Sequence, residues 1–268
     1  MSNIEQSIKS KIEAIGTPLK DWDIQINYGI KTGYNDAFVI TTDKRDEILA
    51  NCQDDDERAR TSEIIRPILR GRDIKRYGYD WSGLWLINTH NGVKEKYPPI
   101  DIKEFPAIKQ HLDLYWDKIS SREDKGITPY NLRNCAYMDD FNKPKIVWIE
   151  LSDEAKFTIC ENLIPLNTVF FITGEKIYNI LGMLNSKITK WYFTHCLGTT
   201  SGVGTNRWLK YTIEQLPLIY NLSGDFEDLI KLMLSNPTKE SEAKIDSTLY
   251  DVYNLSKEEI TFIESLTQ

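Results

Sequence analysis

The chain has 268 residues, of which 41% are hydrophobic and 27% are charged, so it is long enough to bury a sizeable core. Its aromatic content of 11% argues against disorder. No apolar run approaches the roughly 20 residues of a membrane helix, and the four cysteines are scattered without a CxxC pair. These features predict a protein of the reducing cytoplasm with no membrane contact, and they disfavour a zinc site.

The net charge of −7 would ordinarily disfavour nucleic acid as a partner, but the charge is unevenly distributed. Residues 221–268 contain ten acidic residues and four lysines, so this segment carries nearly all of the excess. Residues 176–213 contain five basic residues and no acidic one, and residues 60–80 contain six basic and three acidic residues. The local charge therefore leaves nucleic acid open as a partner.

The N-terminal segment predicts a helix followed by a β-hairpin. Apolar residues with helical spacing precede a glycine that would end the helix, namely Ile4, Ile8, Ile12, Ile15 and Gly16. Residues 22–30 alternate like a strand, and a second apolar run covers residues 38–41. The intervening residues 31–35 contain glycine and asparagine, which favour tight turns. We therefore predict a hairpin with residues 31–35 at its tip.

The rest of the chain predicts strands enclosed by helices. Residues 43–61 are polar and predict a helix or a surface excursion. Strand patterns occur at residues 77–79, 84–87, 143–151, 156–160 and 168–173, and helical patterns at residues 101–119, 175–196, 225–234 and 239–253. A last helix would begin with the capping-box residues Ser256 and Glu259. This order predicts an α+β fold with a β-rich body and a helical C-terminal part.

Three polar loops combine glycine with basic, hydroxyl or amide side chains. The first contains Lys31, Thr32, Gly33, Tyr34 and Asn35; the second Arg70, Arg72, Lys75 and Arg76; the third Thr199, Thr200, Ser201, Gly202, Thr205, Asn206 and Arg207. Backbone N–H groups, hydroxyls and guanidinium groups bind phosphate, and Arg and Asn also contact base edges. Each loop alone is compatible with an ordinary turn. Their joint occurrence in an acidic chain favours a polyanionic ligand.

Catalytic motifs are weak by comparison. The third loop lacks the lysine of a phosphate-binding P-loop, and the three histidines have no metal-ligand spacing. Asp140, Glu154 and Lys156 have residue types that bind Mg²⁺ and assist water in nucleases. However, the apolar strand before them ends at Leu151, so Glu154 and Lys156 would lie in the following turn. A Mg²⁺-dependent nuclease therefore stays open only as an alternative.

Several stretches occur together in a recognisable order: "GIKTGYNDAFVI", "IIRPILRGRDIKRY", "KPKIVWIEL" and "YNILGMLNSKITKWYF". In this order they resemble the TaqI-like C-terminal specificity domain, the target-recognition domain of TaqI-type methyltransferases and type IIG restriction–modification enzymes. The segment "GTTSGVGTNRWLKYTIEQLPLI" is also similar to the specificity subunits of type I systems. The resemblance covers roughly residues 23–264.

The resemblance implies a module that recognises double-stranded DNA in the major groove and selects the site of methylation or cleavage. On this sequence, the three polar loops would make the DNA contacts. We expect an N-terminal helix and linker at residues 1–22, a DNA target-recognition domain at residues 23–220 and an acidic helical tail at residues 221–268.

The catalytic partner of this family carries an Asn-Pro-Pro-Tyr/Phe motif and a glycine-rich S-adenosylmethionine motif, and neither occurs here. We therefore expect no cofactor and no catalysis in this chain. S-adenosylmethionine and Mg²⁺ would belong to a methyltransferase or nuclease domain of the parent enzyme, held in cis or as a partner subunit. A protein-interaction module, with the acidic C-terminal helices docking onto a partner, is the remaining alternative.

Overall fold

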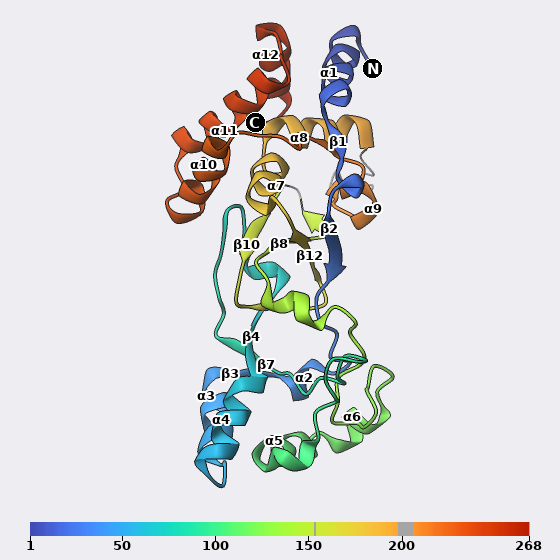
Figure 1. The fold of residues 1–268 in the computed structure, drawn as a ribbon, viewed down its shortest axis with the longest axis vertical. Coiled ribbons are helices and arrows are strands. Elements are labelled where there is room, and N and C mark those ends of the chain that lie inside the picture. The colour runs from blue at the N-terminus through green and yellow to red at the C-terminus, as the bar shows by residue number, and fades with distance from the viewer. Residues whose placement is uncertain (153, 198–205, 268) are drawn as a thin grey trace.

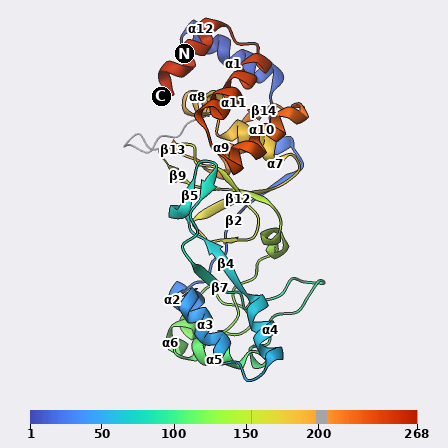
Figure 2. The same cartoon turned by 90° about the vertical axis from the view of Figure 1, so that its left-hand side faces the viewer.

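In the computed structural model, which describes residues 1–152, 154–197 and 206–267, the chain is elongated, with helices at both ends and a sheet between them (Figure 1). Both chain termini lie at the same end (Figures 1 and 2). The predicted α+β class is confirmed. No helix in the described part of the chain is long and apolar enough to cross a membrane.

The central sheet has four antiparallel strands in the order β10-β8-β12-β2. Their bounds are Ile24–Tyr28 for β2, Lys145–Ile149 for β8, Thr158–Cys160 for β10 and Val169–Gly174 for β12. These strands contain the β-branched and aromatic residues that predicted them. Successive side chains of a strand point to opposite faces, so each face of this sheet contributes to a different core.

The first core lies between one face of the sheet and the helices at the end where the termini meet. These helices are α1 (Asn3–Ile15), α7 (Ile177–Leu184), α8 (Lys187–Tyr192), α9 (Lys210–Ile213), α10 (Gly224–Ser235), α11 (Lys239–Val252) and α12 (Lys257–Leu266). The short strands β1 (Thr17–Pro18) and β14 (Pro217–Leu218) pair beside them. The acidic tail therefore places its apolar residues in the same core as Ile8 and Ile12 of α1.

The predicted helix over residues 175–196 is wrong as a single element, because it is interrupted between α7 and α8. The Asn185 carboxamide donates to the Phe157 carbonyl oxygen at 2.9 Å and accepts from the Phe157 N–H at 3.2 Å. The next residue, Ser186, caps α8 by accepting from the Thr189 N–H. A side-chain contact to the residue that precedes β10 therefore accompanies the end of one helix, and a local cap begins another. The chain then forms a π-helical turn at Phe193–Leu197.

The second core fills the opposite end of the molecule. A second sheet, in the order β11-β4-β7-β3, consists of β3 (Val39–Thr41), β4 (Ile65–Leu69), β7 (Leu84–Ile87) and β11 (Ile164–Pro165). The helices here are α2 (Asn35–Phe38), α3 (Thr42–Ala50), α4 (Asp55–Ile64), α5 (Pro106–Asp113) and α6 (Trp116–Ser121). The predicted helix at residues 101–119 is thus divided between a 3₁₀ turn at Ile102–Glu104, α5 and α6.

The predicted β-hairpin around residues 31–35 is wrong. Strand β2 pairs with β12 in the central sheet, whereas β3 pairs with β7 in the second sheet. The residues between them therefore carry the chain from one sheet to the other. The sequence pattern predicted both strands to within about two residues at each end, although Phe38 belongs to α2, but it carries no information about which strand is the partner.

Candidate nucleic-acid interface

The first predicted loop is held internally. The Thr32 hydroxyl is buried and donates to Asn35 Oδ1 at 2.6 Å, while the Thr32 carbonyl oxygen accepts from buried Arg122 at 2.8 Å. Gly33 has φ +73°, and a Cβ there would lie 2.9 Å from the Asp124 Cβ. The sequence pattern in this loop is therefore explained by the turn itself.

Lys31 and Tyr34 of this loop also contact other residues of the protein. Lys31 forms an ion pair with Asp124 at 2.7 Å, and Arg133 contacts the same carboxylate at 3.0 Å. The hydrogen bond from Lys31 is the main cause that holds the pKa of Asp124 below its usual value. Tyr34 is partly buried and lies against Tyr115, with ring centroids 6.2 Å apart.

In the second loop, one arginine is exposed to solvent and another is paired with an aspartate of the same loop. Arg70 donates two hydrogen bonds of 2.8 Å to the Asp73 carboxylate. Hydrogen bonding to Arg70 is the main cause that lowers the pKa of the Asp73 carboxyl. Between them, Arg72 is exposed and forms no ion pair or hydrogen bond with any other described residue. Gly71 lies against the end of β8, because a Cβ there would lie 2.6 Å from Ile149 Cγ2.

The remaining basic residues of this loop diverge. Strands β5 (Ile74–Lys75) and β6 (Gly78–Tyr79) form a short hairpin, in which Lys75 forms an ion pair with Asp80. Arg76 turns towards the helical end, where it contacts Glu242 at 2.8 Å and donates to the Asn185 carbonyl oxygen at 2.6 Å. Arg76 therefore joins the loop to α11.

The third loop falls largely outside the described residues, including Thr199, Thr200, Ser201, Gly202 and Thr205. Its last two residues form β13 (Asn206–Arg207), which pairs antiparallel with β9 (Leu151–Ser152). Arg207 forms an ion pair with Glu150, donating from Nη2 at 2.6 Å and from Nε at 3.2 Å to the same oxygen, Oε1.

The second and third loops are brought together at the end of β8. Gly71 contacts Ile149, and the following residue, Glu150, pairs with Arg207. We call the exposed or half-exposed group around this point the ribbon face; it consists of Arg70, Arg72, Glu150, Leu151 and Arg207. Figure 2 shows β5, β9 and β13 on one side of the molecule.

Two buried tryptophans fix the ribbon face to the first core. The main-chain N–H of Trp208 donates to the Glu150 carbonyl oxygen at 2.7 Å. The indole Nε1 of Trp148 donates to the Trp208 carbonyl oxygen at 2.9 Å. Both indole side chains are almost completely buried. The ends of β8 and β13 are therefore tied together by main chain and packing, which limits their freedom before any ligand binds.

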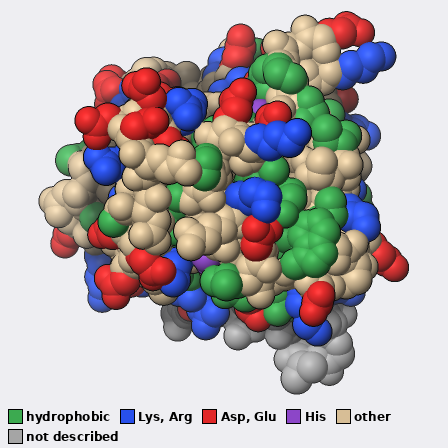
Figure 3. Space-filling model, turned by 90° about the horizontal axis from the view of Figure 1, so that it is seen from below, with side chains coloured by type: hydrophobic (Ala, Val, Ile, Leu, Met, Phe, Trp, Pro, Cys, Tyr) green, Lys and Arg blue, Asp and Glu red, His purple; other side chains and the backbone are tan. Residues whose placement is uncertain are grey.

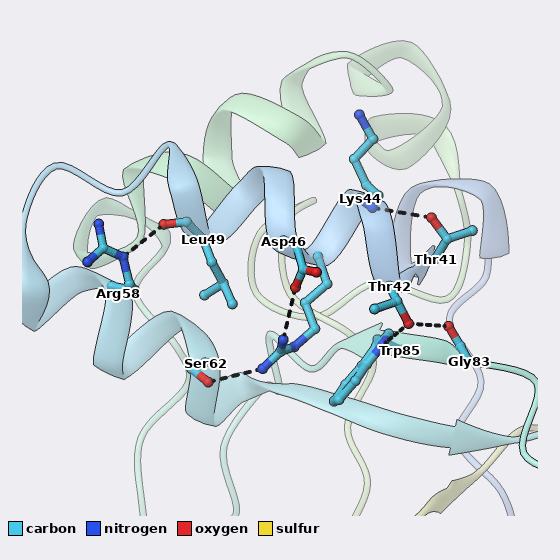
Figure 4. Close-up of polar contacts among 10 residues, drawn as sticks. Thr41, Thr42, Lys44, Asp46, Leu49, Arg58, Ser62, Gly83 and Trp85 are labelled. Carbon is cyan, nitrogen blue, oxygen red and sulfur yellow. Dashed lines mark hydrogen bonds and ion pairs between the residues drawn. The ribbon is translucent and has the colours of Figure 1, made fainter.

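A second basic and aromatic cluster lies on α3 and β7, but its groups contact one another. The Arg45 guanidinium lies 4.2 Å from the Trp85 ring centroid and donates to Asp46 and Ser62. Trp85 Nε1 donates to the Thr42 hydroxyl at 3.0 Å (Figure 4). These contacts pack α3 and α4 against the second sheet, and this structural role explains why basic and aromatic residues occur there.

The end of the molecule with α3–α6 has mixed charge. Seen from below, acidic and basic side chains are interspersed on it (Figure 3). Several are neighbouring pairs on helices: Lys44–Glu47, Arg58–Asp55 and Lys109–Asp113. Such a surface gives no extended positive field, so it is a weaker candidate for phosphate binding than the ribbon face.

The residues of the nuclease alternative lie in different surroundings. Asp140 belongs to the 3₁₀ turn Met138–Asn142 and forms an ion pair with Lys143 at 2.6 Å. Glu154 instead lines a hollow of about 190 Å³ together with Arg76, Lys187 and Lys190. Within the described ranges, no group of three or more His, Cys, Asp or Glu side chains could hold a metal ion.

Sequence reasoning selected the basic residues but missed their acidic partners. Asp73 is three residues from Arg70, so its pairing could have been expected from spacing. Glu150 is 57 residues from Arg207, and only the fold brings the two together. The sequence predicts that Leu151 ends an apolar strand, whereas this exposed residue belongs to the two-stranded ribbon.

The chain thus has an elongated α+β fold in which the second and third polar loops meet at the end of strand β8. The chain belongs to the TaqI-like C-terminal specificity domain family, whose model matches residues 66–218.

Two solved structures share this fold. One is the type IIL restriction–modification enzyme MmeI in complex with DNA, with a TM-score of 0.61 and 13% identity over 93% of this chain. The other is the type IIG restriction endonuclease BpuSI, with a TM-score of 0.56 and 13% identity over 88% of this chain. The chain spans only 36% and 28% of the lengths of these two proteins.

Proposed function

We propose that this chain is a sequence-specific double-stranded DNA recognition module of a restriction–modification enzyme. It selects the DNA site and does not itself carry out methylation or cleavage. Membership of a specificity-domain family supports this role. The likeness of fold to two restriction enzymes, one of them solved with DNA, is consistent with it.

The ribbon face is the observation that carries the proposal. It offers the exposed guanidinium of Arg72 and the half-exposed guanidinium of Arg207 on neighbouring segments with fixed backbone. Cationic side chains on a rigid surface can bind phosphates, while a subset of polar side chains contacts base edges. In the absence of DNA, Arg70 and Arg207 are paired with the carboxylates of Asp73 and Glu150.

The catalytic steps are assigned to other parts of the parent enzyme. S-adenosylmethionine and Mg²⁺ would be bound by a methyltransferase or nuclease domain, attached in cis or present as a partner subunit. The cytoplasm, where chromosomal and invading DNA are both accessible, is the compartment that this role requires.

The test is selection of duplexes from a random-sequence pool by the 268-residue chain, first at low and then at moderate salt. We expect enrichment of one short motif. Arg72→Ala and Arg207→Ala should weaken binding, whereas Lys257→Ala, an exposed lysine of α12 at the far helical end, should not.

Each alternative result would be informative. Binding without enrichment would contradict sequence-specific recognition and leave only a weakly basic surface. Full retention of binding by the arginine variants would show that the ribbon face is not the interface. Absence of binding by a folded chain would overturn the proposal and favour a protein-interaction module.

A further inference from the structure

One edge of the four-stranded central sheet is a second binding surface, separate from the ribbon face. We propose that strand β2 binds an extended segment of another protein chain, which joins the central sheet as an additional strand. The segment is uncharged where it pairs with β2 and carries a lysine or arginine at the end beside Ile24. Addition of a strand to a sheet edge is a recurring mode of peptide recognition.

In the described part of the chain, β2 is an edge strand that pairs with β12 alone (Figure 1). Directly after β2, the Gly29 N–H donates to the Val169 carbonyl oxygen of β12 at 2.7 Å. Main-chain groups of successive residues in an antiparallel strand point to opposite edges, so the odd-numbered residues of β2 also bond to β12. The even-numbered residues direct their main-chain groups away from the sheet: Ile24, Ile26 and Tyr28.

Most of these outward main-chain groups are unpaired. The Ile24 N–H turns back to the Trp22 carbonyl oxygen at 2.9 Å. The Ile24 carbonyl, and the N–H and carbonyl groups of Ile26 and Tyr28, form no hydrogen bond with any described residue. A row of free donors and acceptors is a template for pairing with another extended chain. A partner residue opposite Ile26 would exchange two hydrogen bonds with it, and its neighbours would reach Tyr28 and Ile24.

The sequence of β2 lacks the features that usually protect an edge strand. Natural edges carry lysine, proline, a bulge or an inward-pointing charge that keeps other strands away. Strand β2 reads Ile-Gln-Ile-Asn-Tyr, with no charge, proline or glycine, and its isoleucine and tyrosine residues favour extended structure. Because the strand itself is uncharged, a partner strand that is neutral over this length fits it best.

The opposite edge of the sheet is less suited to strand addition. Strand β10 has three residues, whereas β2 has five. The carbonyl oxygen of Phe157, just before β10, already accepts from the Tyr77 N–H at 3.0 Å and from Asn185 at 2.9 Å. Of the two edges of this sheet, β2 therefore offers the longer row of free main-chain groups.

The start of β2 adds a preference for positive charge. Asp23 and Glu175 are exposed and line a hollow of about 350 Å³ beside Ile24. Neither carboxylate forms an ion pair with another described residue, whereas Lys143, a basic residue of the lining, is paired with Asp140 at 2.6 Å. The hollow therefore presents uncompensated negative charge to a cationic side chain at the end of the incoming strand.

A second copy of β2 fits this edge less well. Antiparallel pairing of two β2 strands about Ile26 would bring the segment after one strand to the hollow of the other. The basic residue of that segment, Lys31, is already paired with Asp124 at 2.7 Å. The free edge and the unpaired carboxylates together thus favour a different segment, neutral where it pairs and basic at one end.

The test selects binders of the 268-residue chain from a pool of random linear seven-residue peptides, in the absence of DNA. We expect enriched peptides to combine uncharged β-branched or aromatic residues with one lysine or arginine at an end. Tyr28 is 48% exposed and its N–H faces away from β12, so Tyr28→Pro removes a free donor without breaking the sheet. This variant should bind the enriched peptide about 10-fold more weakly, or worse.

The charge preference has its own variant. Asp23→Asn with Glu175→Gln keeps the shape of both side chains and should weaken binding by about 2- to 5-fold, with loss of the preference for a basic end. Glu161→Gln, at an exposed carboxylate beside β10, is the matched control and should bind as wild type does. Thermal unfolding of each variant checks that the fold persists.

Amide hydrogen exchange of the wild-type chain tests the edge without any substitution. The amides of Ile26 and Tyr28 should exchange rapidly in the free chain and slowly with the enriched peptide bound, because the peptide supplies their missing acceptors. The amides of Gln25 and Asn27, which bond to β12, should be protected in both states.

Absence of any enriched peptide would overturn the proposal. Unchanged exchange at Ile26 and Tyr28, or full binding by folded Tyr28→Pro, would place the peptide elsewhere and overturn it too. Dimerisation of the chain in analytical ultracentrifugation that Tyr28→Pro abolishes would assign the edge to a second copy instead. Since these experiments contain no DNA, their outcome is independent of the proposed function.

Discussion

Ile146 and Val147 are neighbours on β8, yet their side chains lie in different hydrophobic cores. Ile146 packs with the helices near the termini, whereas Val147 packs with the opposite lobe, and neither is exposed. The same alternation occurs on β12, where Phe171 and Ile172 face opposite sides. The central sheet therefore separates the two cores and contributes side chains to both of them. Each core is bounded on one side by this same sheet.

We predict that the two cores unfold together. Ile146→Ala should destabilise the chain by about 2–5 kcal/mol and Phe171→Ala by about 3–5 kcal/mol, because each leaves a cavity beside the central sheet. Urea unfolding followed by tryptophan fluorescence and by far-UV circular dichroism should give coincident transitions for both variants. Two separated transitions would contradict the prediction that the two cores unfold together, and they would indicate two independently folding units.

This arrangement also explains which parts of the fold were predictable. The strands at β8, β10 and β12 carry a strong local signal, and so do α1 and the tail helices. The capping box of Ser256 and Glu259 is present as predicted. Strand partners are set by long-range packing instead, which is why the hairpin at residues 31–35 was predicted incorrectly. The interruption after Leu184 depends on Asn185 meeting Phe157, a contact that no local pattern contains.

The second prediction separates structural from exposed arginines in one loop. Arg70→Ala should lower the free energy of unfolding by about 1–3 kcal/mol, because it leaves the mostly buried Asp73 carboxylate without its two hydrogen bonds. Arg72→Ala, two residues away, should change it by less than about 0.5 kcal/mol. Chemical denaturation of the two variants measures both. Equal destabilisation would show that the Arg70–Asp73 pair contributes nothing specific.

The third prediction concerns pH. The pKa of Asp73 is lowered in the folded chain, chiefly by its hydrogen bond to Arg70. A lowered carboxyl pKa contributes stability that is present above the unfolded value of about 3.9 and is lost as pH falls through the folded value. The stability difference between wild type and Arg70→Met should therefore be constant near neutral pH and shrink below about pH 4. A difference that persists at low pH would assign the effect to packing of the arginine stem.

The fourth prediction tests the link between the two ends of the sequence. Glu259 accepts from Ser7 at 2.6 Å, from Lys11 at 2.7 Å and from the Ser256 N–H at 2.7 Å, so it joins α1 to α12 as well as capping α12. Ser256→Ala removes only the cap and should cost about 1 kcal/mol. Glu259→Ala removes all three contacts and should cost more. Equal losses in chemical denaturation would show that the contacts to α1 add nothing.

The candidate site was less predictable than the fold. Residue type pointed to Arg70, Arg72 and Arg207, because guanidinium groups suit phosphates and base edges. It could not distinguish an arginine that binds its own chain from one that faces solvent, since that depends on distant carboxylates such as Glu150. Thr32 and Gly33 were selected for the same chemistry, but burial and turn geometry account for them.

The last prediction uses salt to identify phosphate contacts. If Arg72 binds a phosphate, Arg72→Ala should weaken duplex binding to a similar extent for all sequences. It should also lower the slope of log affinity against log salt concentration by about 1, because one fewer counterion is released. The Lys257→Ala control should keep the wild-type slope. Titration of a labelled duplex between low and moderate salt measures both quantities. An unchanged slope with altered base preference would instead make Arg72 a base-reading residue, and it would shift the phosphate contacts to other parts of the ribbon face.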